Sequence, residues 1–352
     1  MAKKANIPHI LIIRLSAMGD VAMTVPVIIA LKRRYPDIKI SLATKPHLIP
    51  IFTGINGLNI IPVHVKTRHK GLLGLWKLYK EIKPLSITHI ADLHNVIRSK
   101  FLRRFFTFEN VSIKQINKGR AEKRMLTKTK NKRLKPLKFT VQRYADVLNA
   151  LGFQIELEEN DILEKGRITA ISPRLTSIDS IKTIGIAPFA AYESKMYDLD
   201  QMQIVIKELT SKYQYTVLLF GGGENEIKKL KVLSNELGDN VLSVAGELDF
   251  EHELALISNL DLMISMDSGN GHLAANYGVP VLTIWGVTHP YAGFGPYRQP
   301  IENSIVPNRD TFPLLPTSIY GNAYPEGYKQ AINSISPQQI IRKVQEILGR
   351  TS

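Results

Sequence analysis

Cysteine is absent from this chain of 352 residues. Its absence excludes disulfide bonds, thiolate metal sites and cysteine nucleophiles, and it fits a reducing cytoplasm. Long apolar runs are missing too, since none approaches the roughly 20 residues that a membrane-spanning helix needs. The apolar run at residues 10–15 is short and lacks a small-residue cleavage site, so we interpret it as a first strand and not as part of a signal peptide.

Several motifs of familiar nucleotide enzymes are also absent. The sequence has neither the G-x-G-x-x-G fingerprint of dinucleotide oxidoreductases nor the Walker A motif of P-loop hydrolases. Its nine histidines show no H-E-x-x-H or comparable ligand spacing. We therefore expect no metal site and no bound cofactor.

Positive charge is abundant but uneven. The formal net charge is +15, and the window from Arg98 to Lys138 holds 15 Lys/Arg against the two acids Glu109 and Glu122, which gives 15 − 2 = +13. Such a window implies an anionic partner at one place, namely nucleic acid, anionic lipid or a phosphorylated substrate, or else a solvated loop that aids solubility. The phenylalanines of the window cluster at its start and do not alternate with the charges, so we expect no nucleic acid partner.

Strand-like apolar runs alternate with helix-like segments along both halves of the chain. Strands are predicted at residues 10–15, 38–43, 60–65, 87–93, 183–187, 215–220, 241–244, 262–266 and 281–285, and helices at 20–35, 72–83, 140–151, 200–212, 226–237, 250–259 and 336–348. Two successive βα arrays indicate an α/β fold with two Rossmann-like, doubly wound domains. We expect an N-terminal domain at 1–165, a connection at 166–182 and a C-terminal domain at 183–335. A last helix is expected at 336–352, and packing of this helix on the N-terminal domain is one alternative.

A glycine-rich turn follows the predicted strand at 262–266. It comprises Asp267, Ser268, Gly269, Asn270 and Gly271 and leads into a helix that begins at His272. Such a turn in a βαβ unit lies at the carboxyl edge of a parallel sheet, and the helix N-terminus there attracts phosphate. We expect an anion site here; the alternative is a tight turn that serves only the fold. For His272, hydrogen bonding to phosphate and a structural role both stay open.

A second turn leaves the first strand through Ser16, Met18, Gly19 and Asp20. Gly19 lets the backbone approach a ligand closely. Asp20 falls in the first helical turn, where the helix dipole favours the ionised carboxylate. Asp20 is therefore a candidate general base, with helix capping as the alternative.

Two further candidates lie in the second half. Lys195 follows the strand at 183–187 and is placed to pair with phosphate, although most lysines are simply solvated. Three glycines, 221–223, follow another strand and precede Glu224, whose carboxylate can accept hydrogen bonds from a ribose. Glu226 competes with Glu224 for that role.

Taken together, these motifs resemble the bacterial heptosyltransferases of glycosyltransferase family nine. The resemblance covers essentially the whole chain and rests on S-x-x-G-D at 16–20, the Lys195 loop, the glycine pair at 221–222, D-[ST]-G-x-x-H at 267–272, A-A-x-x-x-x-P at 274–280 and the loop at 92–100. It implies a GT-B fold, in which two Rossmann-like domains face a central cleft. It also implies an inverting, metal-independent glycosyltransferase of lipopolysaccharide core assembly.

The resemblance assigns roles to individual residues. Asp20 would be the base, Lys195 would neutralise the diphosphate, Glu224 would bind the ribose, and the turn at 267–271 with His272 would bind phosphate. The acceptor side would use Ser16, Met18, Gly19, Arg68, Arg98 and Lys100. The family often has Thr or Ser before the phosphate lysine, whereas Ala190 and Ala191 stand here, which leaves the donor's identity open.

The implied donor is ADP-L-glycero-β-D-manno-heptose. The implied acceptor is a phosphorylated, lipid-linked oligosaccharide of the inner core, reached from the cytoplasmic face of the inner membrane by peripheral contact with its anionic surface. Two alternatives stay open: a GT-B transferase that uses a UDP- or GDP-sugar, and a nucleotide- or RNA-binding module without transferase activity.

Overall fold

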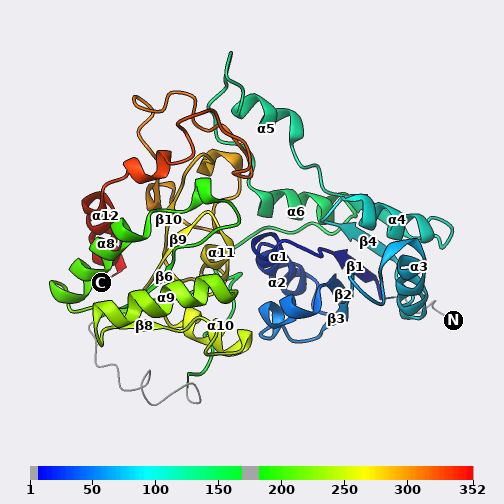
Figure 1. Cartoon of the computed structure of the whole chain (residues 1–352). Helices are drawn as coiled ribbons and strands as arrows, with labels where there is room; N and C mark the ends of the chain where they lie inside the picture. The colour runs from blue at the N-terminus through cyan, green and yellow to red at the C-terminus, as the bar shows by residue number, and fades with distance from the viewer. Residues whose placement is uncertain (1–6, 169–181, 352) are drawn as a thin grey trace. The chain divides into compact units, whose positions relative to one another are not determined.

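The computed structural model describes residues 7–168 and 182–351 (Figure 1). The described chain divides into two units, each built on one parallel β-sheet. Unit 1 takes the described residues up to Lys118 together with Thr140–Leu163. Unit 2 takes Gly119–Phe139 and the described residues from Glu164 onward. The expected pair of Rossmann-like α/β domains is confirmed.

The sheet of unit 1 has the strand order β3-β2-β1-β4-β5. Its strands are β1 (His9–Ile13), β2 (Lys39–Thr44), β3 (Leu58–Pro62), β4 (His89–Asp92) and β5 (Ser112–Gln115). The central strand β1 is buried along its whole length. Its last four residues, 10–13, are all apolar because helices cover both faces of a parallel sheet.

The helices of unit 1 depart from the sequence prediction in two places, namely within residues 18–34 and at residues 97–105, where no helix was predicted. They are α1 (Met18–Ala22), α2 (Val25–Arg34), α3 (Gly71–Ile82), α4 (Ile97–Phe105) and α6 (Thr140–Ala150), with 3₁₀ turns η1 (Pro46–Phe52) and η2 (Lys83–Leu85). The single helix predicted at 20–35 was wrong, since the structure has two. Pro26 lacks the N–H that would continue α1 and clashes with a carbonyl one turn earlier, so the helix restarts at Val25.

The sheet of unit 2 has the strand order β11-β10-β9-β6-β7-β8. Its strands are β6 (Thr183–Ala187), β7 (Thr216–Leu219), β8 (Val241–Ser243), β9 (Leu262–Met266), β10 (Val281–Ile284) and β11 (Ser304–Ile305). The helices are α5 (Arg120–Leu126), α8 (Leu199–Ser211), α9 (Glu224–Leu237), α10 (Phe250–Ser258), α11 (Gly269–Ala275) and α12 (Pro337–Thr351), with 3₁₀ turns η3 (Glu193–Lys195), η4 (Pro290–Ala292), η5 (Ile301–Asn303) and η6 (Ala331–Ser334).

The basic segment Gly119–Phe139 belongs to unit 2, although the sequence places it within the expected N-terminal domain. Lys132 Nζ donates hydrogen bonds to the carbonyl oxygens of Leu314 and Pro316, both at 2.6 Å. The backbone N–H of Leu137 donates to the carbonyl of Tyr291 at 2.9 Å. These partners lie more than 150 residues away along the chain, so local patterns gave no sign of them.

The C-terminal helix also belongs to unit 2. The apolar face of α12 joins the core of this unit through Ile340, Ile341, Val344, Ile347 and Leu348, and the helix packs on α8. The structure therefore assigns this helix to the core of unit 2, and packing on the first domain stays a prediction. Most of the expected connection at 166–182 falls on residues 169–181, which lie outside the described residues.

Candidate active site

In unit 1, an ion pair joins the end of β1 to helix α1. Arg14 Nη2 lies 2.5 Å from Asp20 Oδ2, and the two side chains are 7% and 27% exposed. Arg14 Nη1 also donates to the carbonyl of Leu93 at 2.7 Å, and the N–H of Ala17 donates to Asp20 Oδ2 at 3.3 Å. A buried cation thus fixes a carboxylate that stays partly open to solvent.

The sheet explains why these groups meet. β1 and β4 are parallel neighbours with Ile13 opposite Asp92, so both strands end at the same edge. Asp92 is fully buried. Its Oδ1 accepts the N–H groups of His94 at 3.0 Å and Asn95 at 2.7 Å, which fixes the loop after β4. The predicted turn residues Ser16, Met18 and Gly19 are half-buried around Asp20.

His94 is a feature of this cluster that the sequence motifs did not single out. It is buried, and its Nδ1 finds no hydrogen-bond partner among the described residues. Burial, together with the positive charges of Arg14, Lys118 and Arg98, lowers the pKa of His94 to about 3, while Asp20 acts to raise it. The imidazole is therefore neutral at physiological pH. Its position just past the end of the strand beside β1 is the signal that could have identified it.

The predicted acceptor residues separate into different environments. Arg98, half-buried in the first turn of α4, contributes to the electrostatics of His94. Lys100 is exposed two residues later, which is about 200° around the helix. Arg68 pairs with Glu81 of α3 at 2.6 Å. The structure thus places Arg98 near His94 and ties Arg68 to α3.

In unit 2, Lys195 and Asp267 form a second ion pair. They follow β6 and β9, which are neighbours in the sheet. Lys195 Nζ lies 2.9 Å from Asp267 Oδ2, and the two side chains are 11% and 12% exposed. Thr288 Oγ1 donates to the same carboxylate at 2.9 Å. Gly321, with φ of +93°, lies against the lysine, because a Cβ there would fall 2.5 Å from Lys195 Cδ.

The glycine-rich turn after β9 divides into an accessible part and a packed part. Ser268 is the N-cap residue of α11, and the helix begins at Gly269, three residues earlier than predicted. Ser268, Gly269 and Asn270 are half-buried, whereas Gly271 and His272 are buried. A Cβ at Gly271 would come 2.5 Å from Ser265 Oγ, so this glycine lets α11 pack against β9.

The structure distinguishes the two candidate ribose ligands. Glu226 Oε2 accepts the backbone N–H of Gly222 at 2.8 Å, which closes the turn before α9. Glu224 is exposed as the first residue of α9. Gly223 precedes it with φ of +87°, a conformation that favours glycine.

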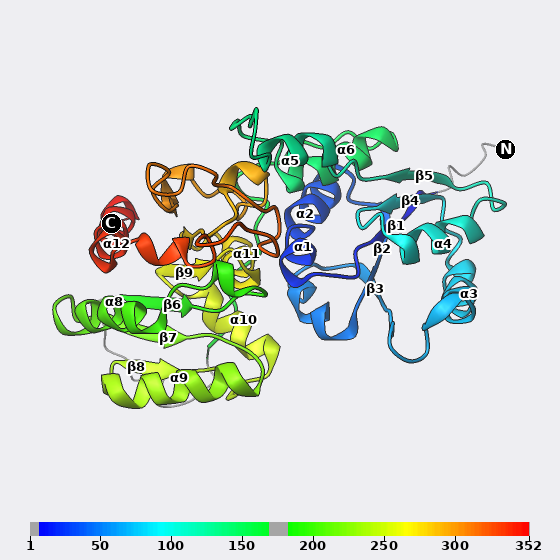
Figure 2. The same cartoon turned by 45° about the horizontal axis from the view of Figure 1, so that its top comes forward.

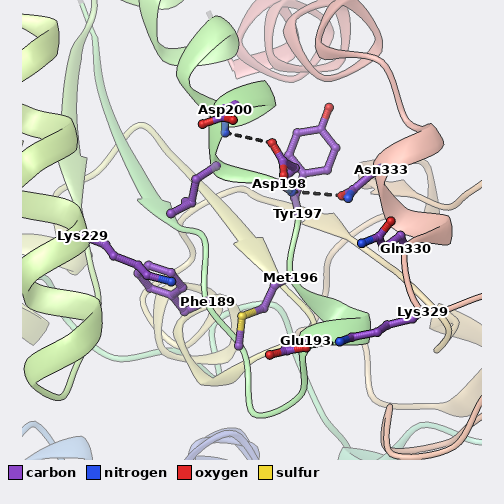
Figure 3. A pocket seen from close by; sticks show the side chains of 11 residues that line it. Phe189, Glu193, Met196, Tyr197, Asp198, Asp200, Lys229, Lys329, Gln330 and Asn333 are labelled. Atoms are coloured by element: carbon purple, nitrogen blue, oxygen red, sulfur yellow. Dashed lines mark hydrogen bonds and ion pairs between the residues drawn. The ribbon is translucent and has the colours of Figure 1, made fainter.

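A pocket of about 340 Å³ adjoins the Lys195 loop (Figure 3). In Figure 3, Glu193 and Lys329 point toward one another across it and form an ion pair. Asn333 Oδ1 accepts the N–H of Asp198 at 3.0 Å. The sequence motifs gave no sign of this pocket because its two walls lie far apart along the chain. It is lined by Phe189, Glu193, Met196, Tyr197, Asp198, Leu199, Asp200, Lys229, Lys329, Gln330 and Asn333.

The described residues hold neither a metal-ligand cluster nor a membrane-spanning helix. Residues 7–168 and 182–351 contain no group of three or more His, Cys, Asp or Glu side chains arranged to hold a metal ion. No helix within the same ranges has both the length and the apolar character to cross a membrane.

Comparisons with known proteins agree on one family. Residues 75–315 match the sequence profile described as Glycosyltransferase family 9 (heptosyltransferase). The lipopolysaccharide heptosyltransferase 1 of Campylobacter coli is 21% identical over 97% of this chain and 99% of its own. The lipopolysaccharide heptosyltransferase 3 of Escherichia coli K12 is 25% identical over 77% and 80%.

Solved structures agree on the fold. A glycosyl transferase family 9 protein of Veillonella parvula DSM 2008 matches with a TM-score of 0.76 at 19% identity, over 99% of this chain and 100% of its own. The E. coli heptosyltransferase WaaC with ADP matches with a TM-score of 0.68 at 16% identity, over 96% and 99%. These likenesses support the GT-B class of two Rossmann-like domains. The chain belongs to glycosyltransferase family 9, the heptosyltransferases.

Proposed function

We propose that this glycosyltransferase moves heptose from ADP-L-glycero-β-D-manno-heptose to the inner core of lipopolysaccharide, with inversion at the anomeric carbon. The observation that carries the proposal is the carboxylate of Asp20, fixed by buried Arg14 yet 27% exposed. The similar proteins of C. coli and E. coli, by their names, are lipopolysaccharide heptosyltransferases. Two E. coli structures of the same fold contain ADP or ADP-2-deoxy-2-fluoro heptose.

Asp20 is the proposed general base. Its carboxylate accepts the proton of the acceptor hydroxyl while that oxygen attacks the anomeric carbon. The new C–O bond forms as the bond to the diphosphate breaks, and ADP leaves. A positioned base of this kind contributes about 10²- to 10⁴-fold to the rate. The ion pair with Arg14 supports this role by holding the carboxylate in one place.

Lys195 is the proposed counter-charge for the diphosphate leaving group. Its ammonium would stabilise the negative charge that develops as ADP departs, without a metal ion. Asp267, which accepts a hydrogen bond from Thr288, holds this lysine at the carboxyl edge of the sheet. The half-buried backbone of Ser268, Gly269 and Asn270, with Gly271 and His272 behind it, would bind phosphate.

Glu224 is the proposed ribose ligand. Its exposed carboxylate is placed to accept hydroxyl hydrogen bonds, whereas Glu226 already accepts the Gly222 N–H. A charged acceptor makes a stronger hydrogen bond than a neutral one.

The proposed acceptor is a phosphorylated, lipid-linked oligosaccharide at the cytoplasmic face of the inner membrane. Arg98, Lys100 and Arg68 supply positive charge for its phosphates in unit 1. The turn of Ser16, Met18 and Gly19 lies next to the base and would shape the position of the reacting hydroxyl. Contact with the anionic leaflet would be peripheral.

Product analysis tests this function. The purified chain is incubated with ADP-heptose and a deep-rough core acceptor, and mass spectrometry follows the acceptor. We expect a mass increase of one heptose with release of one ADP, and a rate about 10²- to 10⁴-fold lower with Asp20→Asn. Thermal-shift measurements with ADP-, GDP- and UDP-sugars and a short RNA accompany the assay. Stabilisation by a GDP- or UDP-sugar alone would refute ADP-heptose as the donor. Stabilisation by RNA alone would refute the proposal that the protein is a glycosyltransferase.

A further inference from the structure

Two helices of unit 1 expose an unusual amount of apolar surface. On α3, Leu72, Leu73 and Trp76 are 56%, 85% and 50% exposed. On α4, Ile97 and Phe101 are 75% and 43% exposed. The two helices pack against each other and lie side by side in Figures 1 and 2. Exposed apolar side chains that gather on two packed helices indicate an interaction surface.

The exposed apolar residues of α3 are different from those that face the core. The core side consists of Leu75, Leu78 and Ile82, which are buried against the sheet. Leu73 lies on the opposite side of the same helix, and Leu72 and Trp76 lie between the two sides. A surface helix normally has a polar outer face. The exposed apolar side chains in the first two turns of α3 therefore indicate a partner outside unit 1.

Positive charge surrounds this apolar surface. Lys77, Lys80, Lys100 and Arg104 are exposed on the two helices. Lys80 Nζ lies 5.0 Å from the centre of the Trp76 ring. Glu81 is the single acid within the two helices, and Arg68 neutralises it at 2.6 Å. Aromatic and leucine side chains within a basic surround match the interface of an anionic bilayer.

The surface also begins at the edge of the sheet that carries Asp20. α3 starts after β3 and α4 after β4, so the first turns of both helices lie at the carboxyl ends of the strands. Leu72, Leu73 and Ile97 are in those first turns. A membrane that met this surface would bring a lipid-linked acceptor to the edge where the proposed base lies.

We propose that the outer faces of α3 and α4 dock unit 1 on an anionic lipid bilayer. Leu72, Leu73, Trp76, Ile97 and Phe101 enter the interfacial region, and the exposed lysines and Arg104 contact lipid phosphates. The physiological meaning of this docking rests on the proposed function, since it supplies a lipid-linked acceptor. The docking itself does not require catalysis, so the two claims fail separately.

Tryptophan fluorescence gives a direct test because the chain has only two tryptophans. Trp76 is 50% exposed and Trp285 is 1% exposed, so a change on docking reports Trp76. With vesicles of phosphatidylglycerol and cardiolipin we expect a blue shift of the emission and quenching by brominated lipids. We expect neither with phosphatidylcholine vesicles, nor in Trp76→Phe.

Paired variants supply the second measurement. Leu73→Ser/Trp76→Ser should lower co-sedimentation with the anionic vesicles at least tenfold. The matched control Ile204→Ser/Val232→Ser removes two side chains of unit 2 that are 50% and 51% exposed, and it should bind vesicles as the wild type does. Turnover of a deacylated, water-soluble acceptor without vesicles should be equal in all three proteins.

The outcomes separate the alternatives. Vesicle binding that is equal in the Leu73→Ser/Trp76→Ser variant and the wild type would overturn the docking proposal. A wild-type dimer that this variant dissociates, without vesicle binding, would overturn it in favour of a second copy of the chain. Docking as expected, with no transfer to any acceptor, would instead count against the proposed function.

Discussion

Each unit has an ion pair at the carboxyl edge of its sheet. In unit 1 a second contact fixes the cation of the pair, whereas in unit 2 it fixes the carboxylate. In unit 1 the buried member is Arg14, at 7% exposure, and a second contact to the Leu93 carbonyl holds it. Its partner Asp20 is 27% exposed. In unit 2 the second contact goes to the acid, because Asp267 also accepts the Thr288 hydroxyl. Lys195 and Asp267 are buried to nearly the same extent.

This difference teaches which group each pair presents to a ligand. Where the cation is tied to the backbone, the carboxylate is the group left to react. Where the carboxylate is tied to a hydroxyl, the ammonium is the group left to bind an anion. Unit 1 thus presents the carboxylate that we propose as the base, and unit 2 presents the ammonium that we propose as the phosphate ligand.

The largest expected effect is the loss of turnover when the carboxylate of the unit 1 ion pair is removed. Asp20→Asn keeps the shape of the side chain but removes the proton acceptor, so kcat should fall by about 10²- to 10⁴-fold. Steady-state kinetics with ADP-heptose and saturating acceptor measure this loss. Far-UV circular dichroism of the variant controls for folding. Turnover within threefold of the wild type would show that another group is the base.

The second prediction concerns a buried histidine in each unit. Burial with nearby positive charge lowers the pKa of His94 to about 3 and that of His289 to about 4. Each folded pKa is below the unfolded value of about 6.5. The unfolded state therefore binds protons first as pH falls below 6.5, and stability is lost down to the folded pKa. For each histidine, lowering the pH from 7 to 4 should reduce the free energy of unfolding by about 3 kcal/mol, because the unfolded state takes up the proton.

Urea unfolding at the two pH values measures this cost. His94→Gln and His289→Gln should each reduce the pH-dependent loss by about 3 kcal/mol. His252→Gln, which changes an exposed histidine paired with Asp249, should leave most of that loss in place. An unchanged loss in His94→Gln would mean that His94 is not held neutral beside the Arg14–Asp20 pair.

The smallest expected effect concerns ADP affinity and distinguishes Glu224 from Glu226 in unit 2. Glu224→Gln should weaken ADP binding by about five- to tenfold, because a charged acceptor of the ribose hydroxyls is lost. Glu226→Gln should change ADP affinity less, since its carboxylate contacts the Gly222 N–H. Fluorescence titration with ADP compares the two variants. The reverse order of effects would make Glu226 the ribose ligand.

The secondary structure of both units was predictable because apolar runs mark the buried parallel strands. The strand at 262–266 and its glycine turn are examples, and the structure has β9 at Leu262–Met266. The break between α1 and α2 was missed because apolar spacing continues through it, while Pro26 interrupts the backbone hydrogen bonds. The membership of α5 in unit 2 was missed because Lys132 contacts carbonyls far along the chain.

The candidate site was predictable as a set of residues but not as a set of contacts. Motifs named Asp20, Lys195 and Asp267, since small and charged residues follow the strands. They gave no sign that Asp267 holds Lys195, because that pair depends on β6 and β9 being neighbours, nor that Arg14 folds back on Asp20 across the turn after β1. His94 was missed for the same reason.

Calorimetric titration of ADP into the wild type, Lys195→Met and Asp20→Asn tests the division of labour between the two pairs most directly. The account predicts that Lys195→Met weakens ADP binding about tenfold or more, because a charge-assisted contact to the diphosphate is lost. It predicts that Asp20→Asn binds ADP with the affinity of the wild type. Unchanged affinity in Lys195→Met, or an equal loss in Asp20→Asn, would contradict it.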